Sequence, residues 1–165
     1  MPILDPNDLE FLSHSPDQSR RIGVRLGELL KPGDVLCLAG DLGSGKTTLA
    51  QGIARGWGCI DPVTSPTFVL INEYRRPDST RLYHLDAFRL SGSEEARGLD
   101  LATLFAAEGP LLIEWPERVA DVLPGERMWI HLRWVDDSLR RIRFEVVGGR
   151  YERLLREFRK AAFGS

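Results

Sequence analysis

The most constraining feature of the chain is the sequence of residues 40–47, Gly-Asp-Leu-Gly-Ser-Gly-Lys-Thr, which follows the apolar run 35–39, Val-Leu-Cys-Leu-Ala. Two glycines separated by four residues and followed by Lys-Thr match the phosphate-binding loop pattern. The glycines allow successive backbone N–H groups to point into one concave anion site, while the lysine ammonium and the threonine hydroxyl can reach phosphate and magnesium. The sequence therefore predicts a buried strand, this loop and a helix N-terminus that together bind a nucleoside triphosphate.

The helices on either side of this loop are predicted from hydrophobic spacing. Apolar residues recur at every fourth position over 49–57, which predicts a helix that Gly58 ends. An earlier helix is predicted over about 17–30, with Ser15 as its cap and Pro16 at its first position.

Five other segments have strand-like sequences. The first two are separated only by turn residues and predict a hairpin, and the last two alternate apolar and polar residues, which predicts an antiparallel pair with one solvated face. Short helices are predicted after Ser91 and Asp100, and an amphipathic helix from about Tyr151. The predicted strands are 68–71, 81–85, 111–113, 128–134 and 140–147.

These elements predict an α/β fold, a three-layer P-loop NTPase-like sandwich with a mixed parallel and antiparallel central sheet. The 165 residues suit one domain, 1–165, that includes the strand pair at about 127–147 and the helix at about 150–161. We expect this domain to be a monomer when it is alone.

Composition excludes several function classes. The net charge of −2 gives no long-range attraction to nucleic acid or membranes, so contact with RNA is expected to be local or made through a partner. The N-terminus lacks the pattern of a signal peptide and no run of 18 apolar residues occurs, so we expect a cytoplasmic protein that does not enter the membrane. Cys37 and Cys59 form no CxxC motif, and Cys37 is predicted to be a core residue.

Two acidic residues, Asp86 and Glu114, each follow a predicted strand. In open α/β sheets the carboxyl ends of the strands face the ligand crevice. Mg²⁺ is usually held by one or two carboxylates together with phosphates and waters. Asp86 and Glu114 are therefore candidates for the metal site, and the sequence does not say which of them binds the ion.

Histidines and loop hydroxyls carry weaker signals. His84 lies on the same strand face as Asp86, and we interpret it as a structural residue that orients this aspartate, with a catalytic role as the alternative. His14 and His131 are interpreted as surface or core residues. The hydroxyls of segment 64–67 suit either a switch that senses the γ-phosphate or an ordinary turn, and the residues alone favour the turn.

Four segments together resemble the TsaE family, also called YjeE, small bacterial P-loop ATPases required for threonylcarbamoyladenosine modification of tRNA. The resemblance runs from about 15 to 147; Ser-Pro-Thr-aromatic and Glu-Trp-Pro are more specific than the loop. Phe88 stands where the family usually has tyrosine and Ser44 where alanine is usual, so we assign no chemistry to position 88. The segments, in the order of the family, are Gly40 to Thr48, Ser65-Pro66-Thr67-Phe68, His84-Leu85-Asp86-Ala87-Phe88-Arg89 and Glu114-Trp115-Pro116.

The resemblance implies a role for each matching residue. It implies an Mg²⁺-dependent ATPase in which Thr47, Asp86 and Glu114 surround the metal, and Thr67 is the switch residue near the γ-phosphate. Together with Lys46, the two acids and this threonine are the implied catalytic residues. The implied ATP-binding residues are Asp41, Leu42, Gly43, Ser44, Gly45, Lys46, Thr47, Thr48, Trp115, Ser19 and Arg140.

The resemblance also implies partners, a TsaD-like threonylcarbamoyl transferase and a TsaB-like protein, with tRNA reached only through their complex. Hydrolysis by the isolated chain is expected to be slow, because no arginine finger lies beside the site in the sequence.

Three other functions stay open. A small-molecule kinase usually carries an arginine-rich lid, for which Arg75-Arg76 is the only tempting pair. A GTPase would need an Asn-Lys-x-Asp motif, which the sequence lacks. A nucleotide-dependent assembly module would hydrolyse ATP only incidentally.

Overall fold

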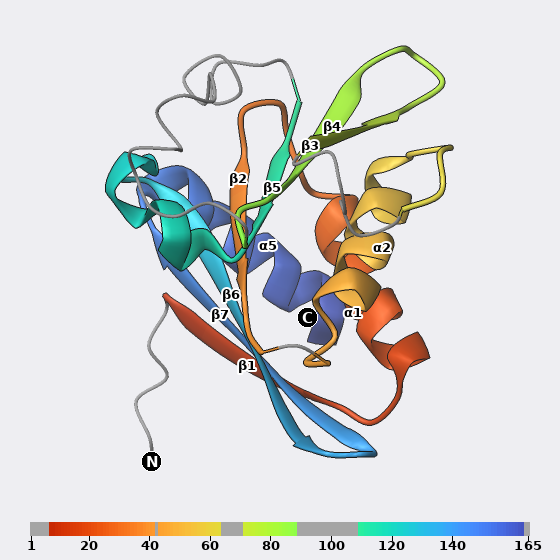
Figure 1. The fold of residues 1–165 in the computed structure, drawn as a ribbon, viewed down its shortest axis with the longest axis vertical. Coiled ribbons are helices and arrows are strands. Elements are labelled where there is room, and N and C mark those ends of the chain that lie inside the picture. Colours follow the sequence, from red (N-terminus) through yellow and green to blue (C-terminus); the bar gives the residue numbers. More distant parts are fainter. Residues whose placement is uncertain (1–6, 42, 64–70, 89–108, 164–165) are drawn as a thin grey trace.

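A seven-stranded sheet organises the described part of the chain (Figure 1). The structure is a computed structural model and describes residues 7–41, 43–63, 71–88 and 109–163. The strands lie in the order β1-β7-β6-β2-β5-β4-β3. In chain order the elements are β1 Asp8–Ser13, α1 Pro16–Gly27, β2 Val35–Ala39, α2 Lys46–Trp57, β3 Ile71–Arg75, β4 Arg81–Asp86, β5 Leu111–Glu114, the 3₁₀ helix η1 Pro116–Val122, β6 Arg127–Asp136, β7 Leu139–Val147 and α5 Gly149–Phe163.

The sheet has two unlike halves. The parallel half consists of β2, β5 and β4 with the edge strand β3, and the antiparallel half consists of β6, β7 and β1. Strand β2 pairs in parallel with β5 and β6, and β5 pairs in parallel with β4. Strand β3 is antiparallel to β4, and β7 is antiparallel to both β6 and β1. The predicted hairpin and the predicted C-terminal strand pair are thus confirmed. The predicted α/β fold with a mixed sheet is confirmed. Because β2, β4 and β5 run in one direction, their carboxyl ends meet at one edge of the sheet.

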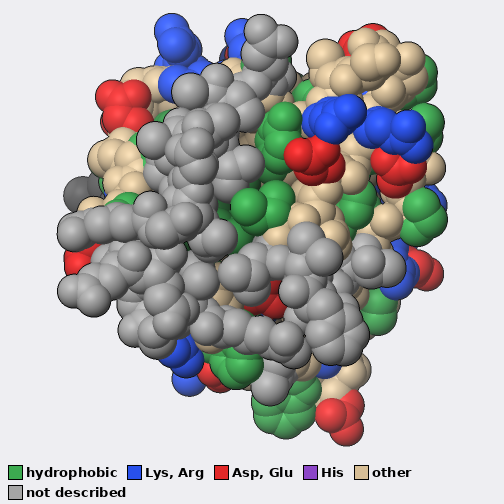
Figure 2. Space-filling model, turned by 45° about the horizontal axis from the view of Figure 1, so that its top comes forward, with side chains coloured by type: hydrophobic (Ala, Val, Ile, Leu, Met, Phe, Trp, Pro, Cys, Tyr) green, Lys and Arg blue, Asp and Glu red, His purple; other side chains and the backbone are tan. Residues whose placement is uncertain are grey.

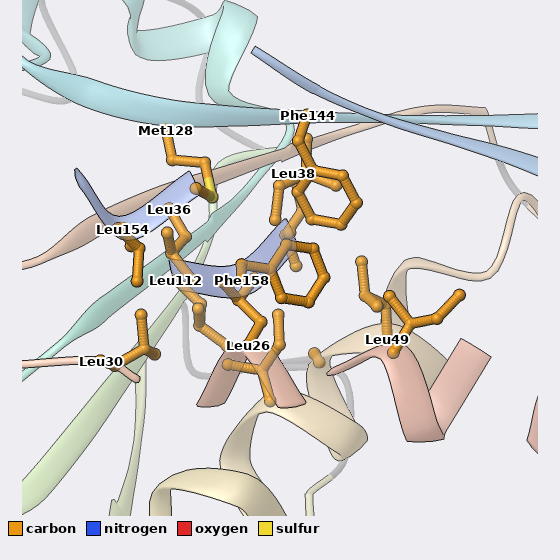
Figure 3. Packing of buried hydrophobic residues seen from close by; sticks show 14 of the residues in the cluster. Leu26, Leu30, Leu36, Leu38, Leu49, Leu112, Met128, Phe144, Leu154 and Phe158 are labelled. Atoms are coloured by element: carbon orange, nitrogen blue, oxygen red, sulfur yellow. The ribbon is translucent and has the colours of Figure 1, made fainter. Parts of the chain in front are cut away.

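Two apolar clusters cover the two faces of the sheet. The larger one joins the sheet to α1, α2 and α5, and Figure 3 shows Leu26 of α1, Phe144 of β7 and Phe158 of α5 turned toward one another. The smaller one packs Val119 of η1 against the opposite face, where the predicted core residue Cys37 is fully buried. In Figure 1, η1 lies on one side of β2 and β5 and the helices α1 and α2 on the other.

Helices α1 and α2 approach each other closely through glycines. A Cβ atom added at Gly27 would collide with the carbonyl oxygen of Ile53, and one added at Gly56 would collide with that of Val24. Without side chains at these positions the two backbones can pack directly, which locks the helix that follows the phosphate loop onto α1. Gly58 ends α2 with a φ of 102°, as predicted.

Three predictions about element boundaries need correction. Helix α1 begins after its predicted cap Ser15 but ends at Gly27, not near residue 30. The N–H groups of Leu29 and Leu30 bond to carbonyls only three residues back, which tightens the chain into a turn. Arg75, predicted to break its strand, pairs with Arg81 inside the hairpin. The predicted strand residues 68–70 and the helices expected near 91–105 lie outside the described residues.

Strand β1 was not predicted at all. It is a six-residue edge strand that pairs with β7, with Phe11 opposite Ile142 and Ser13 opposite Arg140. Its alternation of polar and apolar residues is too short to stand out in the sequence, and its pairing partner lies more than 120 residues away along the chain. The strand matters for the site because it ends where α1 begins.

The described surface carries mixed charges. On the face drawn in Figure 2, basic and acidic side chains lie next to each other. Ion pairs at the β3–β4 hairpin join Arg76 to Asp78 and Arg81 to Glu73. Within the described ranges, no helix is long and apolar enough to cross a membrane.

Candidate functional site

A cavity of about 570 Å³ opens where the carboxyl ends of β4 and β5 meet the start of α2. Its walls also include the segment that joins the end of β1 to the start of α1, and the β6–β7 turn. Five separate segments of the chain therefore contribute. The lining residues are Ser13, His14, Ser15, Pro16, Ser19, Asp41, Gly43, Gly45, Lys46, Thr47, Thr48, Asp86, Phe88, Glu114, Trp115, Asp137, Ser138, Leu139 and Arg140.

Lys46, the first residue of α2, is buried at the floor of this cavity. The preceding residue, Gly45, has a φ of 102° and lets the loop turn directly into the helix. The Lys46 Nζ donates to the carbonyl oxygens of Gly40 and Asp41, and it lies 4.2 Å from the centroid of the Trp115 ring. Burial lowers the pKa of Lys46, and nearby carboxylates oppose this. An ammonium held in this way can exchange the loop carbonyls for phosphate oxygens.

The described loop residues differ in their exposure to the cavity. Asp41, Gly43, Thr47 and Thr48 line it, as a phosphate cradle would require. Ser44 does not line it: its hydroxyl oxygen is buried and has no hydrogen-bond partner among the described residues. The predicted nucleotide contact Leu42 lies outside the described residues.

Asp86 and Glu114 lie directly opposite each other at the ends of β4 and β5. Both line the cavity, so the structure brings together the two acids that the sequence singled out. Asp86 is half-buried, and its Oδ1 accepts a hydrogen bond of 2.9 Å from the Phe88 backbone N–H. Burial raises the pKa of Asp86; the Phe88 hydrogen bond opposes this rise and the charge of Glu114 adds to it.

His84 is bound to Glu114, not to the aspartate that we expected it to orient. Its Nε2 lies 2.6 Å from Glu114 Oε2, and its Nδ1 lies 3.1 Å from the Tyr74 hydroxyl. His84 does share a strand face with Asp86, as the sequence indicated, but Asp86 is turned to its own loop. The expectation was wrong because the spacing of residues along β4 does not indicate a partner on the neighbouring strand β5.

An aromatic wall stands beside the two acids. Trp115 has left-handed backbone angles, φ 57° and ψ 49°, which are rare for a bulky residue and indicate that the surrounding structure holds it there. Its ring packs on Phe88 with 4.9 Å between centroids. Phe88 thus contributes an apolar surface to the cavity, although no chemistry was predicted for position 88.

The far end of the cavity is built by residues that sequence reasoning mostly missed. Ser19 and Arg140, both predicted to approach the nucleotide, do line it. The Ser19 hydroxyl lies 2.6 Å from that of Ser13, which was not predicted. His14 is exposed, in keeping with its interpretation as a surface or core residue, and it also lines the cavity, which was not predicted. Without β1, the pairing of Ser13 with Arg140 could not be foreseen; the cap Ser15 was the only local signal nearby.

The donor set suits Mg²⁺. Two carboxylates, Asp86 and Glu114, and the Thr47 hydroxyl line one cavity beside a lysine, which matches an ion held by one or two carboxylates and by phosphates. Among the described residues, no three His, Cys, Asp or Glu side chains cluster as a cage made by protein alone would require. The predicted switch residue Thr67 lies outside the described residues.

Comparison with known proteins gives consistent matches. Residues 13–142 match the family model described as threonylcarbamoyl adenosine biosynthesis protein TsaE. The tRNA threonylcarbamoyladenosine biosynthesis protein TsaE of Bacillus subtilis is 40% identical over 149 residues, which cover 90% of this chain and 92% of that protein. Its namesake from Streptomyces coelicolor is 39% identical over 137 residues, 81% of this chain and 92% of that protein. The crystal structure of Bacillus subtilis YdiB superposes with a TM-score of 0.79 at 36% identity, covering 94% of this chain and 96% of that one.

Proposed function

The chain belongs to the TsaE family of threonylcarbamoyl adenosine biosynthesis proteins, and we propose that it serves this tRNA modification by binding and hydrolysing ATP. The observation that carries the proposal is one cavity that joins Lys46 of the phosphate loop to the carboxylates of Asp86 and Glu114. A phosphate cradle and acids for its metal are the two parts that phosphoryl transfer to water requires.

Binding follows from the loop and the helix behind it. The backbone N–H groups of the loop and the positive end of the α2 dipole attract the triphosphate. Lys46 then exchanges the carbonyl oxygens of Gly40 and Asp41 for phosphate oxygens. The phosphate charge favours the protonated lysine and so opposes the effect of its burial. Ser19 and Arg140 line the same cavity, which supports the proposal that they contact the nucleotide.

Hydrolysis requires a water in line with the bond that breaks. The water oxygen attacks the γ-phosphorus, the bond from this phosphorus to the β–γ bridging oxygen breaks, and ADP leaves with that electron pair. Asp86 and Glu114, with Thr47, are the residues that would hold Mg²⁺, which supplies positive charge to the phosphates when bound. An acid not engaged by the ion is placed to orient the water and accept its proton.

We further propose that a TsaD-like transferase and a TsaB-like protein are the partners of this chain. The chain has a net charge of −2, which suits an ATPase that reaches tRNA through a complex better than one that grips RNA itself. Turnover by the chain alone is then slow and rises when the partners are added.

Calorimetry and steady-state hydrolysis test this function with two lysine variants. Lys46→Ala is expected to reduce hydrolysis by about 10²–10³-fold, the effect of removing one preorganised charge donor from the transition state. Lys160→Ala, at an exposed position of α5, is the matched control and is expected to behave as the wild type. A folded wild type that gives no heat with ATP and Mg²⁺ would contradict the proposal. A phosphorylated metabolite formed from a panel of acceptors would point to a kinase instead.

A further inference from the structure

Three buried side chains form a hydrogen-bonded chain across β3, β4 and β5, behind the carboxylates of the cavity. Tyr74 is 3% exposed, His84 0% and Glu114 4%. The Tyr74 Oη lies 3.1 Å from His84 Nδ1, and His84 Nε2 lies 2.6 Å from Glu114 Oε2. Of the three residues, only Glu114 lines the cavity. Tyr74 and His84 therefore do not contact a ligand in the cavity themselves, and Glu114 is the residue of this chain that does.

The hydrogen-bonding capacity of the groups fixes the direction of the chain. An ionised carboxylate only accepts, so the Nε2–H of His84 donates to Glu114. When the imidazole is neutral, its Nδ1 accepts and the Tyr74 hydroxyl is the donor. The side-chain amide of Asn72 lies 3.4 Å from Tyr74 Oη and donates toward it. In this arrangement every group donates to the next until the carboxylate is reached, and the neutral ring of His84 is the Nε2–H tautomer.

We propose that His84, supported by Tyr74, is a positioning residue that holds the Glu114 carboxylate in the orientation required by the triphosphate and its metal. The role rests on the proposed ATPase function. Because His84 occupies Oε2, the remaining oxygen Oε1, which has no hydrogen-bond partner among the described residues, is the one presented to a ligand. A histidine that fixes a ligating carboxylate from behind is a recurrent way of tuning metal sites.

The arrangement separates the two acids of the site. Asp86 accepts from the backbone of its own loop, whereas Glu114 is held by a side chain from the neighbouring strand. A polar ring as deeply buried as His84 is costly unless its nitrogens are paired, and both of them are. The positioning role therefore predicts that His84 is coupled more strongly to Glu114, to which it is hydrogen-bonded, than to Asp86, which bonds to its own loop.

Steady-state ATP hydrolysis by the full chain tests this with three variants. His84→Leu, which removes the donor, is expected to lower kcat by about 10–100-fold and to leave the KM for ATP within about threefold. His84→Gln keeps an N–H near the position of Nε2 and is expected to stay within about fivefold of the wild type. Tyr74→Phe, which removes one hydroxyl, is expected to fall between them. His131→Leu is the matched control, because this histidine is partly exposed and lies 3.7 Å from Glu145 without a hydrogen bond to it.

A double-mutant cycle separates positioning from a merely structural role. In a Glu114→Gln background, His84→Leu is expected to cost less than about a further twofold, while in an Asp86→Asn background it keeps its full effect. An equal loss in both backgrounds overturns the proposal, as does a His84→Leu protein with native circular dichroism and unchanged kcat. If His84→Leu does not fold, Tyr74→Phe and His84→Gln carry the same comparison.

Two readouts distinguish failure of this inference from failure of the ATPase proposal. In ¹⁵N-histidine-labelled protein, NMR is expected to show His84 as the Nε2–H tautomer, with its Nδ1 signal shifted in Tyr74→Phe. The opposite tautomer overturns the inference whatever hydrolysis shows.

The second readout is the gain in ATP affinity from added Mg²⁺. If the wild type binds ATP without hydrolysing it, the ATPase proposal fails, and this gain then tests the role of His84. That gain is expected to be lost in His84→Leu and retained in His84→Gln; retention in both overturns the inference. A wild type that binds no ATP overturns both.

Discussion

The two halves of the sheet each contain a histidine close to a glutamate, in opposite surroundings. The side chains of His84 and Glu114, in the parallel half, are 0% and 5% exposed, and Nε2 and Oε2 lie 2.6 Å apart. His131 and Glu145, in the antiparallel half, are 40% and 47% exposed and lie 3.7 Å apart. The 3.7 Å contact is too long for a hydrogen bond, and Nε2 of His131 is buried without a hydrogen-bond partner among the described residues, whereas both ring nitrogens of His84 are hydrogen-bonded. The same two side-chain types are therefore a fixed element in one region and an incidental contact in the other.

The burial of the strands also differs between the parallel and the antiparallel half of the sheet. Every residue of β5 is buried, because parallel strands are covered on both faces. Strand β7 alternates buried and solvated positions, and its outward side chains form ion pairs such as Arg141 with Glu10. The parallel half supplies a dry environment in which charges act strongly on a ligand, while the antiparallel half supplies a solvated face and only one edge of the cavity, near Arg140.

The largest contrast is expected in stability. Leu112→Ala, at a fully buried position of β5, should lower the free energy of unfolding by about 2–5 kcal/mol, because it removes packed atoms and leaves a cavity. Leu12→Ala, at a position of β1 that is 47% exposed, should change it by less than about 0.5 kcal/mol. Urea unfolding of both variants measures the difference. Similar values would mean that the two halves are equally buried in solution.

The next contrast is expected in catalysis. Glu114→Gln should reduce ATP hydrolysis by about 10²–10³-fold, because a neutral amide cannot replace a charge next to the metal and the phosphates. Glu145→Gln should leave the rate within about twofold, since its carboxylate lies on the solvated face. Steady-state rates of the two variants, each checked for its fold, decide the matter. A loss in Glu145→Gln would show that the antiparallel half takes part in the reaction.

A smaller effect is expected at the edge strand. Arg143 binds Asp8 through two nitrogens and so ties β7 to β1 at a partly exposed site. Arg143→Ala should cost about 0–1 kcal/mol, and the cost should shrink at high salt because exposed charges are screened. Thermal unfolding at low and high ionic strength measures it, with Arg133→Ala on β6 as the control. A large loss that is insensitive to salt would contradict the view of this face as a solvated one.

The smallest effect is a pH dependence of stability at the site. Burial raises the pKa of Asp86 in the folded state, so the ionised carboxylate destabilises the fold at neutral pH. Asp86→Asn should therefore be more stable than the wild type at pH 7, and the gain should vanish as the pH falls below the ordinary aspartate pKa, where both states bind the proton.

The control for this effect has the opposite sign. Hydrogen bonds from Thr80 lower the pKa of Asp78, so Asp78→Asn should lose stability at neutral pH and match the wild type in acid. Unfolding curves of both variants across this range provide the test. Equal slopes for Asp86→Asn and the wild type would show that Asp86 is not destabilised by its burial.

Much of the site follows from local sequence. The loop from Gly40 to Thr47 has its pattern within eight residues, and Asp86 and Glu114 end apolar strands, so their place at the cavity could be predicted. Helix limits marked by a local residue, Ser15 and Gly58, were also predictable. In each case the chemistry that fixes the conformation lies within a few residues of the position concerned.

The partner of His84, the edge strand β1 and the contribution of Ser13 and His14 to the cavity needed the tertiary structure. His84 and Glu114 are 30 residues apart, and Ser13 meets Arg140 only because β1 pairs with β7. A residue sequence determines which backbone turns and helix ends are possible, since these depend on neighbours along the chain. Which distant side chains meet depends on strand order and register, and these are decided by how the whole core packs.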